Sequence, residues 1–248
     1  MKAIILAAGY ATRLYPLTKD MPKALLPIAG KAMLDYLFDE ITSIHRIDEA
    51  VIVSNHRFAA QFEAWAQNAA EKYPALNIRV LDDGTTGNDN RLGAIGDMQY
   101  AVTHADIDDD VLVAASDNLF SFRLADFVED YASHGFDTIL AQPMEDYETR
   151  KRFAIATLDS QNRVLSLVEK PQEPQSDIAV YGLYIYRRDT VPLIAQYLRE
   201  GNNPDAPGHF PEWLFRRKEV RAYLFTGSCV DIGTVESYHA VCAEYENK

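Results

Sequence analysis

The sequence is poor in the residues that cross-link a chain or anchor it in a membrane. Only two cysteines occur among its 248 residues, Cys229 and Cys242, and they have neither metal-ligand spacing nor the number that a disulfide framework needs. No apolar run approaches the roughly 20 residues that cross a bilayer. The apolar run 3–8 is also shorter than the core of a secretory signal. We therefore expect a cytoplasmic protein without a membrane partner.

Basic residues are also scarce. The chain has 24 lysines and arginines against 37 aspartates and glutamates, which gives a formal net charge of -13. A surface this acidic repels nucleic acid and anionic membranes, so neither is an expected partner. Any phosphate-bearing ligand must be held by a few local cations.

Two common phosphate-binding motifs are missing. The sequence has no G-x-G-x-x-G, and near the end of the second predicted strand it has Ser54-Asn55-His56 rather than the ribose-binding acid of a dinucleotide site. It also has no G-x-x-x-x-G-K-[ST]. These absences exclude a simple dinucleotide site and a P-loop.

Strands and helices alternate in the first half of the chain. Buried apolar runs predict four strands, and apolar residues at helical spacing predict three helices between them. The order favours an α/β fold with a mixed, mostly parallel sheet between two helical layers, a three-layer α/β/α arrangement. The predicted strands are 2–8, 49–54, 77–81 and 111–115, and the predicted helices are 34–44, 58–69 and 92–103.

The pattern changes after about residue 142, where shorter strand-like runs begin. No linker separates the two halves, so a single domain over 1–248 is expected. The later strands are predicted at 153–158, 163–169, 178–186 and 220–225, and the helices at 190–198, 210–217 and from Val235 onward.

Small residues follow the first predicted strand. Leu6 is followed by Ala7, Ala8 and Gly9, then by Ala11 and Thr12. Small side chains let backbone N–H groups approach an anion, and the carboxyl end of such a strand is where open α/β sheets bind ligands. Arg13 and Lys23 add two cations to this loop.

Residues 6–18, Leu-Ala-Ala-Gly-Tyr-Ala-Thr-Arg-Leu-Tyr-Pro-Leu-Thr, and 22–28, Pro-Lys-Ala-Leu-Leu-Pro-Ile, resemble the opening signature of the sugar-1-phosphate nucleotidyltransferases. That family includes glucose-1-phosphate thymidylyltransferases and uridylyltransferases and mannose-1-phosphate guanylyltransferases. The resemblance implies a Rossmann-like, GT-A-like fold and transfer of NMP from an NTP to a sugar 1-phosphate, with Mg²⁺ as cofactor. One departure is Ala11, where the family usually has glycine.

Two further segments resemble the nucleotide and metal sites of this family. Leu92-Gly-Ala-Ile-Gly96 is similar to its L-G-T-A-G, and 111–118 to the strand that ends in G-D, although Ser116 replaces the glycine. Val230-Asp-Ile-Gly-Thr234 is similar to D-x-G-T. The resemblance implies that Asp117 and Asp231 are metal ligands. It also implies nucleotide binding within 1–142, by Leu6, Ala8, Gly9, Ala11, Thr12 and Gly93.

Acceptor binding is implied within 143–248. Val168-Glu-Lys-Pro171 matches the family's E-K-P, and Tyr181-Gly182 is similar to the strand that follows it. By resemblance, Glu169 would bind substrate hydroxyls, Lys170 the substrate phosphate, and Gly182 the acceptor. Phe153-Ala154 stands where many members have Tyr-Gly, which leaves the acceptor's identity open.

The resemblance also implies roles for the two loop cations. Arg13 would bind the triphosphate and the leaving pyrophosphate, and Lys23 the charge that develops at the α-phosphate. Enzymes of this kind commonly form homo-oligomers, which is an expectation by analogy.

Two alternatives stay open. One is a cytidylyltransferase for phosphocholine or a polyol phosphate, whose head group would suit an aromatic pocket; Phe153, Tyr181, Tyr184, Phe210 and Trp213 are candidates, although core packing is expected for most of them. The other is an inactive nucleotide-binding regulatory homologue, suggested by the substitutions Ala11, Ser116 and Ala154.

Overall fold

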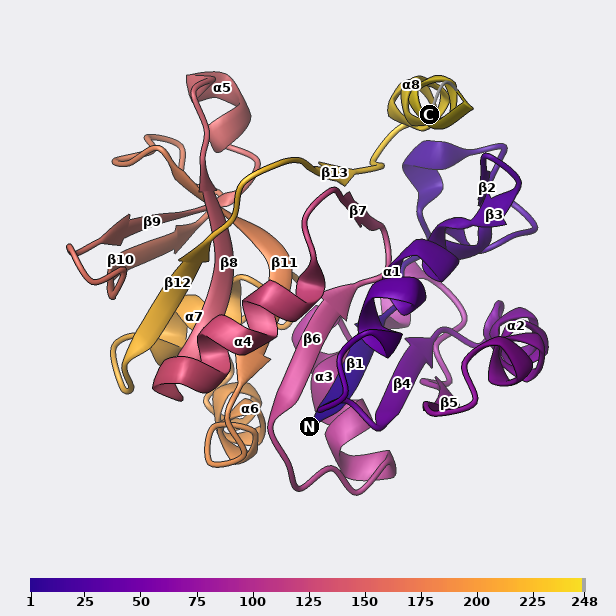
Figure 1. Ribbon diagram of the computed structural model, residues 1–248, viewed down its shortest axis with the longest axis horizontal. Coiled ribbons are helices and arrows are strands. Elements are labelled where there is room, and N and C mark those ends of the chain that lie inside the picture. Colours follow the sequence, from indigo (N-terminus) through magenta and orange to yellow (C-terminus); the bar gives the residue numbers. More distant parts are fainter. Residues whose placement is uncertain (247–248) are drawn as a thin grey trace.

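The computed structural model describes residues 1–246, and within them nine strands form one mixed sheet (Figure 1). Its main path runs β10-β9-β11-β6-β1-β4-β5, and β8 and β12 continue from β11. This sheet passes through both halves of the chain and positions all the loops discussed below.

The parallel part of the sheet is built by the N-terminal half. Strand β1 (Lys2–Leu6) lies between β4 (Glu49–Ser54) and β6 (Val111–Ala115), and β5 (Asn77–Asp82) lies beyond β4, all parallel. Helices cover both of its faces, which explains why β1, β4 and β6 have continuous apolar runs rather than alternating ones. The helices between the strands are α1 (Met33–Thr42), α2 (Ala59–Lys72) and α3 (Ala94–His104).

Two apolar cores, one on each side of the sheet, make the three layers. Ile5 packs with Phe38 of α1 and Phe127 of α4 (Leu124–His134), whereas Ile4 belongs to the core that contains Met98 of α3 and Ile194 of α6 (Pro192–Arg199). Neighbouring residues of one strand point to opposite faces, so a single strand contributes to both cores. The predicted three-layer fold class is confirmed.

The second half of the chain extends the sheet with mainly antiparallel strands. Strand β11 (Ile178–Tyr186) pairs antiparallel with β6, β8 and β9, and so joins the two halves. The remaining elements of this half are β8 (Asp137–Pro143), α5 (Tyr147–Arg150), β9 (Ala154–Leu158), β10 (Val164–Glu169), α7 (His209–Leu214) and β12 (Val220–Leu224).

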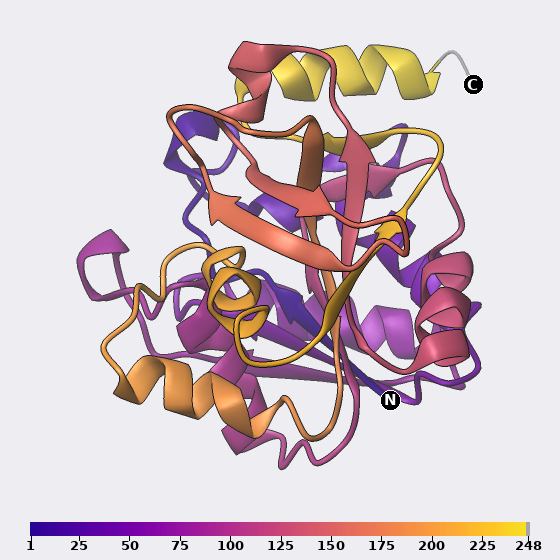
Figure 2. The ribbon, with the colours of Figure 1, turned by 90° about the vertical axis from the view of Figure 1, so that its left-hand side faces the viewer.

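Two small sheets bring the end of the chain to its beginning. Strand β7 (Asn118–Phe120) pairs with β13 (Cys229–Asp231), and β2 (Pro27–Ile28) pairs with β3 (Lys31–Ala32). The C-terminal helix α8 (Val235–Glu246) then packs against β2, where the Tyr238 hydroxyl donates to the Pro27 carbonyl at 2.6 Å. In Figures 1 and 2, α8 lies at the end of the molecule far from the N-terminus.

Most predicted elements occur where expected, and the differences are local. The predicted strand 2–8 ends at Leu6, because the chain turns into the loop there, and the predicted helix 210–217 ends at Leu214. Helix α4, strand β8, and the short strands β7 and β13 were not predicted. Among residues 1–246, no helix has the length and apolar character to cross a membrane.

Candidate active site

The loop after β1 crosses the carboxyl edge of the sheet and is fixed there by polar contacts. The Asn55 side chain donates to the Ala8 carbonyl at 2.9 Å, and the Thr18 hydroxyl donates to the Ala11 carbonyl at 2.8 Å. A short 3₁₀ helix, η1 (Thr12–Leu14), follows and carries Arg13. The first contact gives a role to Asn55, which follows β4 directly: it holds this loop in place instead of binding a ribose.

Ala11 adopts the left-handed conformation, with φ 47° and ψ 41°. This is the position at which the family usually has glycine, and an L-residue with a Cβ is disfavoured there by about 1–2 kcal/mol. Ala11 therefore keeps the backbone path that a glycine would give, at a cost in stability.

Lys23 lies between the two aspartates that the sequence singled out. It belongs to the 3₁₀ helix η2 (Lys23–Leu25), and its Nζ is 2.6 Å from Asp117 Oδ2 and 3.2 Å from Asp231 Oδ1. The lysine side chain is only 13% exposed. The two carboxylates are therefore close enough to share one cation, although 113 residues of sequence separate Asp117 from Asp231.

The pairing of β7 with β13 brings the aspartates together. Asp231 is opposite Asn118 in the register of these strands, and the Ile232 N–H donates to the Asp117 carbonyl at 3.5 Å. Each strand has three residues, so the site depends on a short ladder that closes a long loop.

The charges of this cluster are balanced among themselves. Partial desolvation, and then the neighbouring Asp117 charge, raise the pKa of Asp231, while Lys23 and Arg13 oppose the shift. Carboxylate oxygens are ligands that Mg²⁺ accepts, and it usually needs only one or two of them beside phosphate oxygens and water. No cluster of three or more His, Cys, Asp or Glu ligands occurs between residues 1 and 246. Asp117 and Asp231 can thus hold such a cation only with ligand oxygens completing its coordination.

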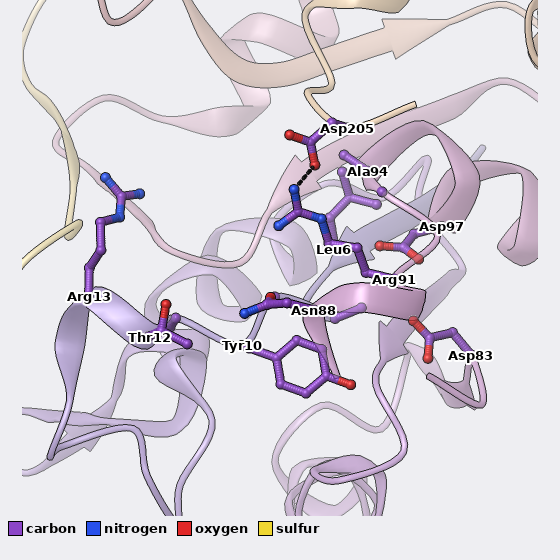
Figure 3. Close-up of a pocket in the computed structure, with 14 residues that line it drawn as sticks. Leu6, Tyr10, Thr12, Arg13, Asp83, Asn88, Arg91, Ala94, Asp97 and Asp205 are labelled. Atoms are coloured by element: carbon purple, nitrogen blue, oxygen red, sulfur yellow. Dashed lines mark ion pairs between the residues drawn. The ribbon is translucent and has the colours of Figure 1, made fainter. Parts of the chain in front are cut away.

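Three cavities lie beside Arg13, which lines all of them, and the second and third also reach Asp117. The first cavity, of about 330 Å³, lies between the loop after β1, the start of α3 and the segment 83–91 (Figure 3). The second cavity, of about 220 Å³, lies between the same loop and the pair Lys23 and Asp117. The third cavity, of about 420 Å³, extends from Asp117 and Asp231 to β9, β10 and β11.

The predicted nucleotide-side residues line the first two cavities. Those that line the first are Leu6, Ala8, Gly9, Ala11, Thr12 and Gly93. A Cβ at Gly93, whose φ is +79°, would come within 2.6 Å of the Pro204 carbonyl oxygen. The Ala94 N–H donates to the Asp205 carbonyl at 3.1 Å, and the Ile95 N–H donates to the Pro204 carbonyl at 2.9 Å. Only glycine allows this close contact between the two halves of the chain.

The predicted acceptor-side residues, Glu169, Lys170 and Gly182, line the third cavity. Burial raises the pKa of Glu169, whose side chain is 8% exposed, and the nearby Lys170 and His209 oppose the shift. A Cβ at Gly208 would lie 2.0 Å from Glu169 Oε2. Gly208 therefore provides the space that the Glu169 carboxylate occupies.

Several cavity residues escaped the sequence analysis. Arg152 lines the third cavity and directly precedes Phe153-Ala154 in the sequence. Its positive charge beside that motif could have indicated a phosphate-binding residue. Asp205 lines both the first and third cavities and pairs with Arg91 at 2.8 Å (Figure 3). It lies between α6 and α7 in a segment without a recognisable sequence motif, so the sequence did not indicate that it lines a cavity. Asp83 and Asp97 complete the first cavity.

The aromatic candidates separate into two groups. Phe153, Tyr181 and Tyr184 line the third cavity. Phe210 is fully buried in the core that contains Ile4, and Trp213 packs beside it with ring centroids 5.9 Å apart. Tyr181 and Tyr184, at 7% and 3% exposure, also belong to the buried cores. The expected core packing is therefore confirmed for four of the five candidates, and Phe153 is the least buried of them.

Comparison with known proteins agrees with this geometry. The family model for nucleotidyl transferases matches residues 2–248. The low-salt glycan biosynthesis nucleotidyltransferase Agl11 of Haloferax volcanii is 27% identical over 186 residues, and the alignment covers 75% of this chain and 49% of Agl11. The UTP–glucose-1-phosphate uridylyltransferase AglF of the same organism is 26% identical over 186 residues, which are 75% of this chain and 72% of AglF.

A solved structure shows the same fold. UDP-glucose pyrophosphorylase, crystallised with UDP-glucose, superimposes with a TM-score of 0.82 over 100% of this chain and 99% of its own, at 20% identity. The match of the family model to nearly every residue confirms the resemblance drawn from the opening loop. The chain belongs to the nucleotidyl transferase family.

Proposed function

We propose that this protein transfers a nucleoside monophosphate from an NTP to a sugar 1-phosphate, giving an NDP-sugar and pyrophosphate. The observation that carries the proposal is the Lys23 ammonium between Asp117 and Asp231, close to Arg13, which lines three cavities. Each cavity suits one part of the reactants. The first would bind the nucleoside, the second would bind the triphosphate, and the third would bind the acceptor.

Asp117 and Asp231 are the residues that would hold Mg²⁺. Two oxygen ligands within reach of one shared cation fit its preference for few carboxylates and several phosphate oxygens. When bound, the ion would neutralise phosphate charge on both reactants.

Lysine and arginine side chains would bind and orient the phosphate groups of both substrates. Arg13 would bind the triphosphate and keep hold of the leaving pyrophosphate, and Lys23 would stabilise the charge at the α-phosphorus. Lys170 and Arg152 would orient the acceptor phosphate for in-line attack. No side chain needs to act as a general base, because a phosphate monoester is already ionised near neutral pH.

Relatives of this chain support a sugar 1-phosphate as the acceptor. AglF is named for its action on UTP and glucose 1-phosphate. The buried Glu169 carboxylate at the wall of the third cavity supports the same assignment, since carboxylates accept hydrogen bonds from sugar hydroxyls.

One observation favours a second acceptor class. Phe153, Tyr181 and Tyr184 stand near Glu169 in the third cavity, and an aromatic wall with one carboxylate also suits a cationic head group such as that of phosphocholine. The second candidate is therefore a cytidylyltransferase for phosphocholine or a polyol phosphate. An inactive regulatory homologue is less well supported, since Arg13, Lys23, Asp117, Lys170 and Asp231 all remain and face the cavities.

A pyrophosphate-release assay tests the proposal. Each NTP is paired with sugar 1-phosphates, phosphocholine and polyol phosphates, with and without Mg²⁺. We expect release with a sugar 1-phosphate only when Mg²⁺ is present. Release restricted to CTP with phosphocholine or a polyol phosphate would establish the second candidate, and binding of NTP without any turnover would refute both.

A further inference from the structure

The first cavity contains a buried carboxyl group that the reaction does not use. Asp97, in the first turn of α3, is 7% exposed and lines the cavity. Its Oδ1 atom accepts no hydrogen bond from any described residue. Figure 3 shows Asp97 and Asp83 on one wall of the cavity, with the Asp97 carboxyl group turned toward the interior. This buried oxygen faces Asp83, whose Oδ2 is also buried without a donor, so the two can share a proton. The other carboxyl oxygen of Asp97 is therefore the one that a ligand in the cavity can reach.

The carboxyl group of Asp83 faces that of Asp97. Asp83 follows β5, and its Oδ1 accepts from the Thr85 N–H at 2.7 Å, while its Oδ2 is also buried without a donor among residues 1–246. Burial, and then the charge of Asp83, raise the pKa of Asp97 to about 8. Two facing carboxyl groups in this state share one proton, as like charges cannot both ionise at close range. The outer oxygen of Asp97 remains an acceptor toward the cavity.

A structural ion pair does not account for these carboxyl groups. Arg91 lines the same cavity, but its guanidinium pairs with Asp205 at 2.8 Å. Within the part of the chain that the structure describes, neither Asp83 nor Asp97 forms an ion pair with a lysine, arginine or histidine. The Asp97 carboxyl group, backed by Asp83, therefore offers one acceptor oxygen to a ligand in the first cavity, and neither carboxyl group brings a paired cation there.

We propose that Asp97, supported by Asp83, selects the base of the nucleotide by accepting a hydrogen bond from an exocyclic amino group. Cytosine, guanine and adenine carry such a group, whereas uracil and thymine would bring a carbonyl or a methyl group to the same oxygen. The inference rests on the proposed function, because it takes the first cavity to be the nucleoside site. The preferred substrate is then CTP, GTP or ATP rather than UTP or dTTP.

Binding of uncleavable nucleotides tests this selection without relying on turnover. The α,β-methylene analogues of CTP, GTP, ATP, UTP and dTTP are titrated calorimetrically into the whole protein. We expect at least one amino-bearing nucleotide to bind about 10- to 100-fold more tightly than UTP and dTTP, as a hydrogen bond to a charged group provides.

Three variants of Asp97 and one control separate selection from folding. Asp97→Ala removes the acceptor and abolishes the preference, and Asp97→Leu, which fills the volume with apolar atoms, does the same. Asp97→Asn keeps an outward oxygen when its amide donates to Asp83, and so retains much of the preference. The control Asp89→Asn changes an exposed carboxylate of segment 83–91 that does not line the first cavity, and it leaves the preference unchanged.

The possible failures of the two proposals can be told apart. Equal or tighter binding of UTP or dTTP by the wild-type protein overturns the selection, and so does a preference that survives in Asp97→Ala and Asp97→Leu. In both cases pyrophosphate release can still confirm the transferase. A base preference without any pyrophosphate release overturns the transferase and leaves the selection standing, and absence of all nucleotide binding overturns both.

Discussion

Replacing Asp97 with asparagine should make the protein more stable, and increasingly so as the pH rises. The group is 7% exposed, and burial together with Asp83 raises its pKa from 3.8 to about 8. Between these two values the folded protein holds a proton that the unfolded chain has released. The free energy of unfolding therefore falls with increasing pH over this range, as linkage requires.

The size of this effect follows from the shift. Four pKa units, at about 1.4 kcal/mol per unit, correspond to roughly 6 kcal/mol of unfolding free energy that is present near pH 4 and lost by pH 8. An asparagine side chain does not titrate, and its amide N–H can replace the shared proton facing Asp83. The stability difference between variant and wild type should thus increase steadily across this range and level off above it.

Urea unfolding at a series of pH values from about 4 to 9 measures this difference. Carboxylates other than Asp83 titrate alike in both proteins, so the comparison isolates the Asp83–Asp97 pair. The control Asp89→Asn, at an exposed position, should give a curve parallel to that of the wild type. A stability difference for Asp97→Asn that is independent of pH would refute the raised pKa and the shared proton.

Three further substitutions test the site. Lys23→Ala should raise the barrier for nucleotidyl transfer by about 2.7–4 kcal/mol, as loss of a preorganised charge does; near-normal kcat in single-turnover assays would contradict this role. Ala11→Gly should raise the free energy of unfolding by about 1 kcal/mol or less by relieving the left-handed conformation, and thermal unfolding that shows no gain would rule out strain there. Gly208→Ala should displace Glu169, since the new Cβ lies 2.0 Å from its Oε2; KM should rise several-fold for the acceptor and stay constant for the NTP, and equal changes in both would indicate a general distortion.

Parallel strands β4 and β6 could be predicted because their own residues show that both of their faces are buried. Strands β4 and β6 are buried on both faces, so each is a continuous apolar run bounded by polar residues, and their predicted bounds agree with the structure. Helix α4 was missed although its sequence carries a signal: Leu124, Phe127, Val128 and Tyr131 recur at helical spacing and are all buried.

The short strands of the site carry no comparable signal. Strands β7 and β13 have three residues each, and they are strands only because distant parts of the chain pair with one another. Asp117 and Asp231 were singled out by resemblance, whereas the ladder that brings them together was not. Asp97 and Asp205 could not be found in either way, because separate segments of the chain bring them to one cavity.

The charge pattern of the site would allow so acidic a protein to bind the triphosphate of the proposed reaction. The chain carries a formal net charge of -13, yet Arg13 and Lys23 balance Asp117 and Asp231, so this cluster is nearly neutral. An approaching polyanion thus meets no carboxylate in this cluster without a neighbouring cation. The surrounding negative surface repels longer polyanions such as nucleic acid. Lys23 is indispensable to this balance because its removal leaves two carboxylates facing each other. The Lys23→Ala variant should therefore also bind the NTP more weakly at low ionic strength than at high, and a salt dependence unchanged from wild type would show that the balance lies elsewhere.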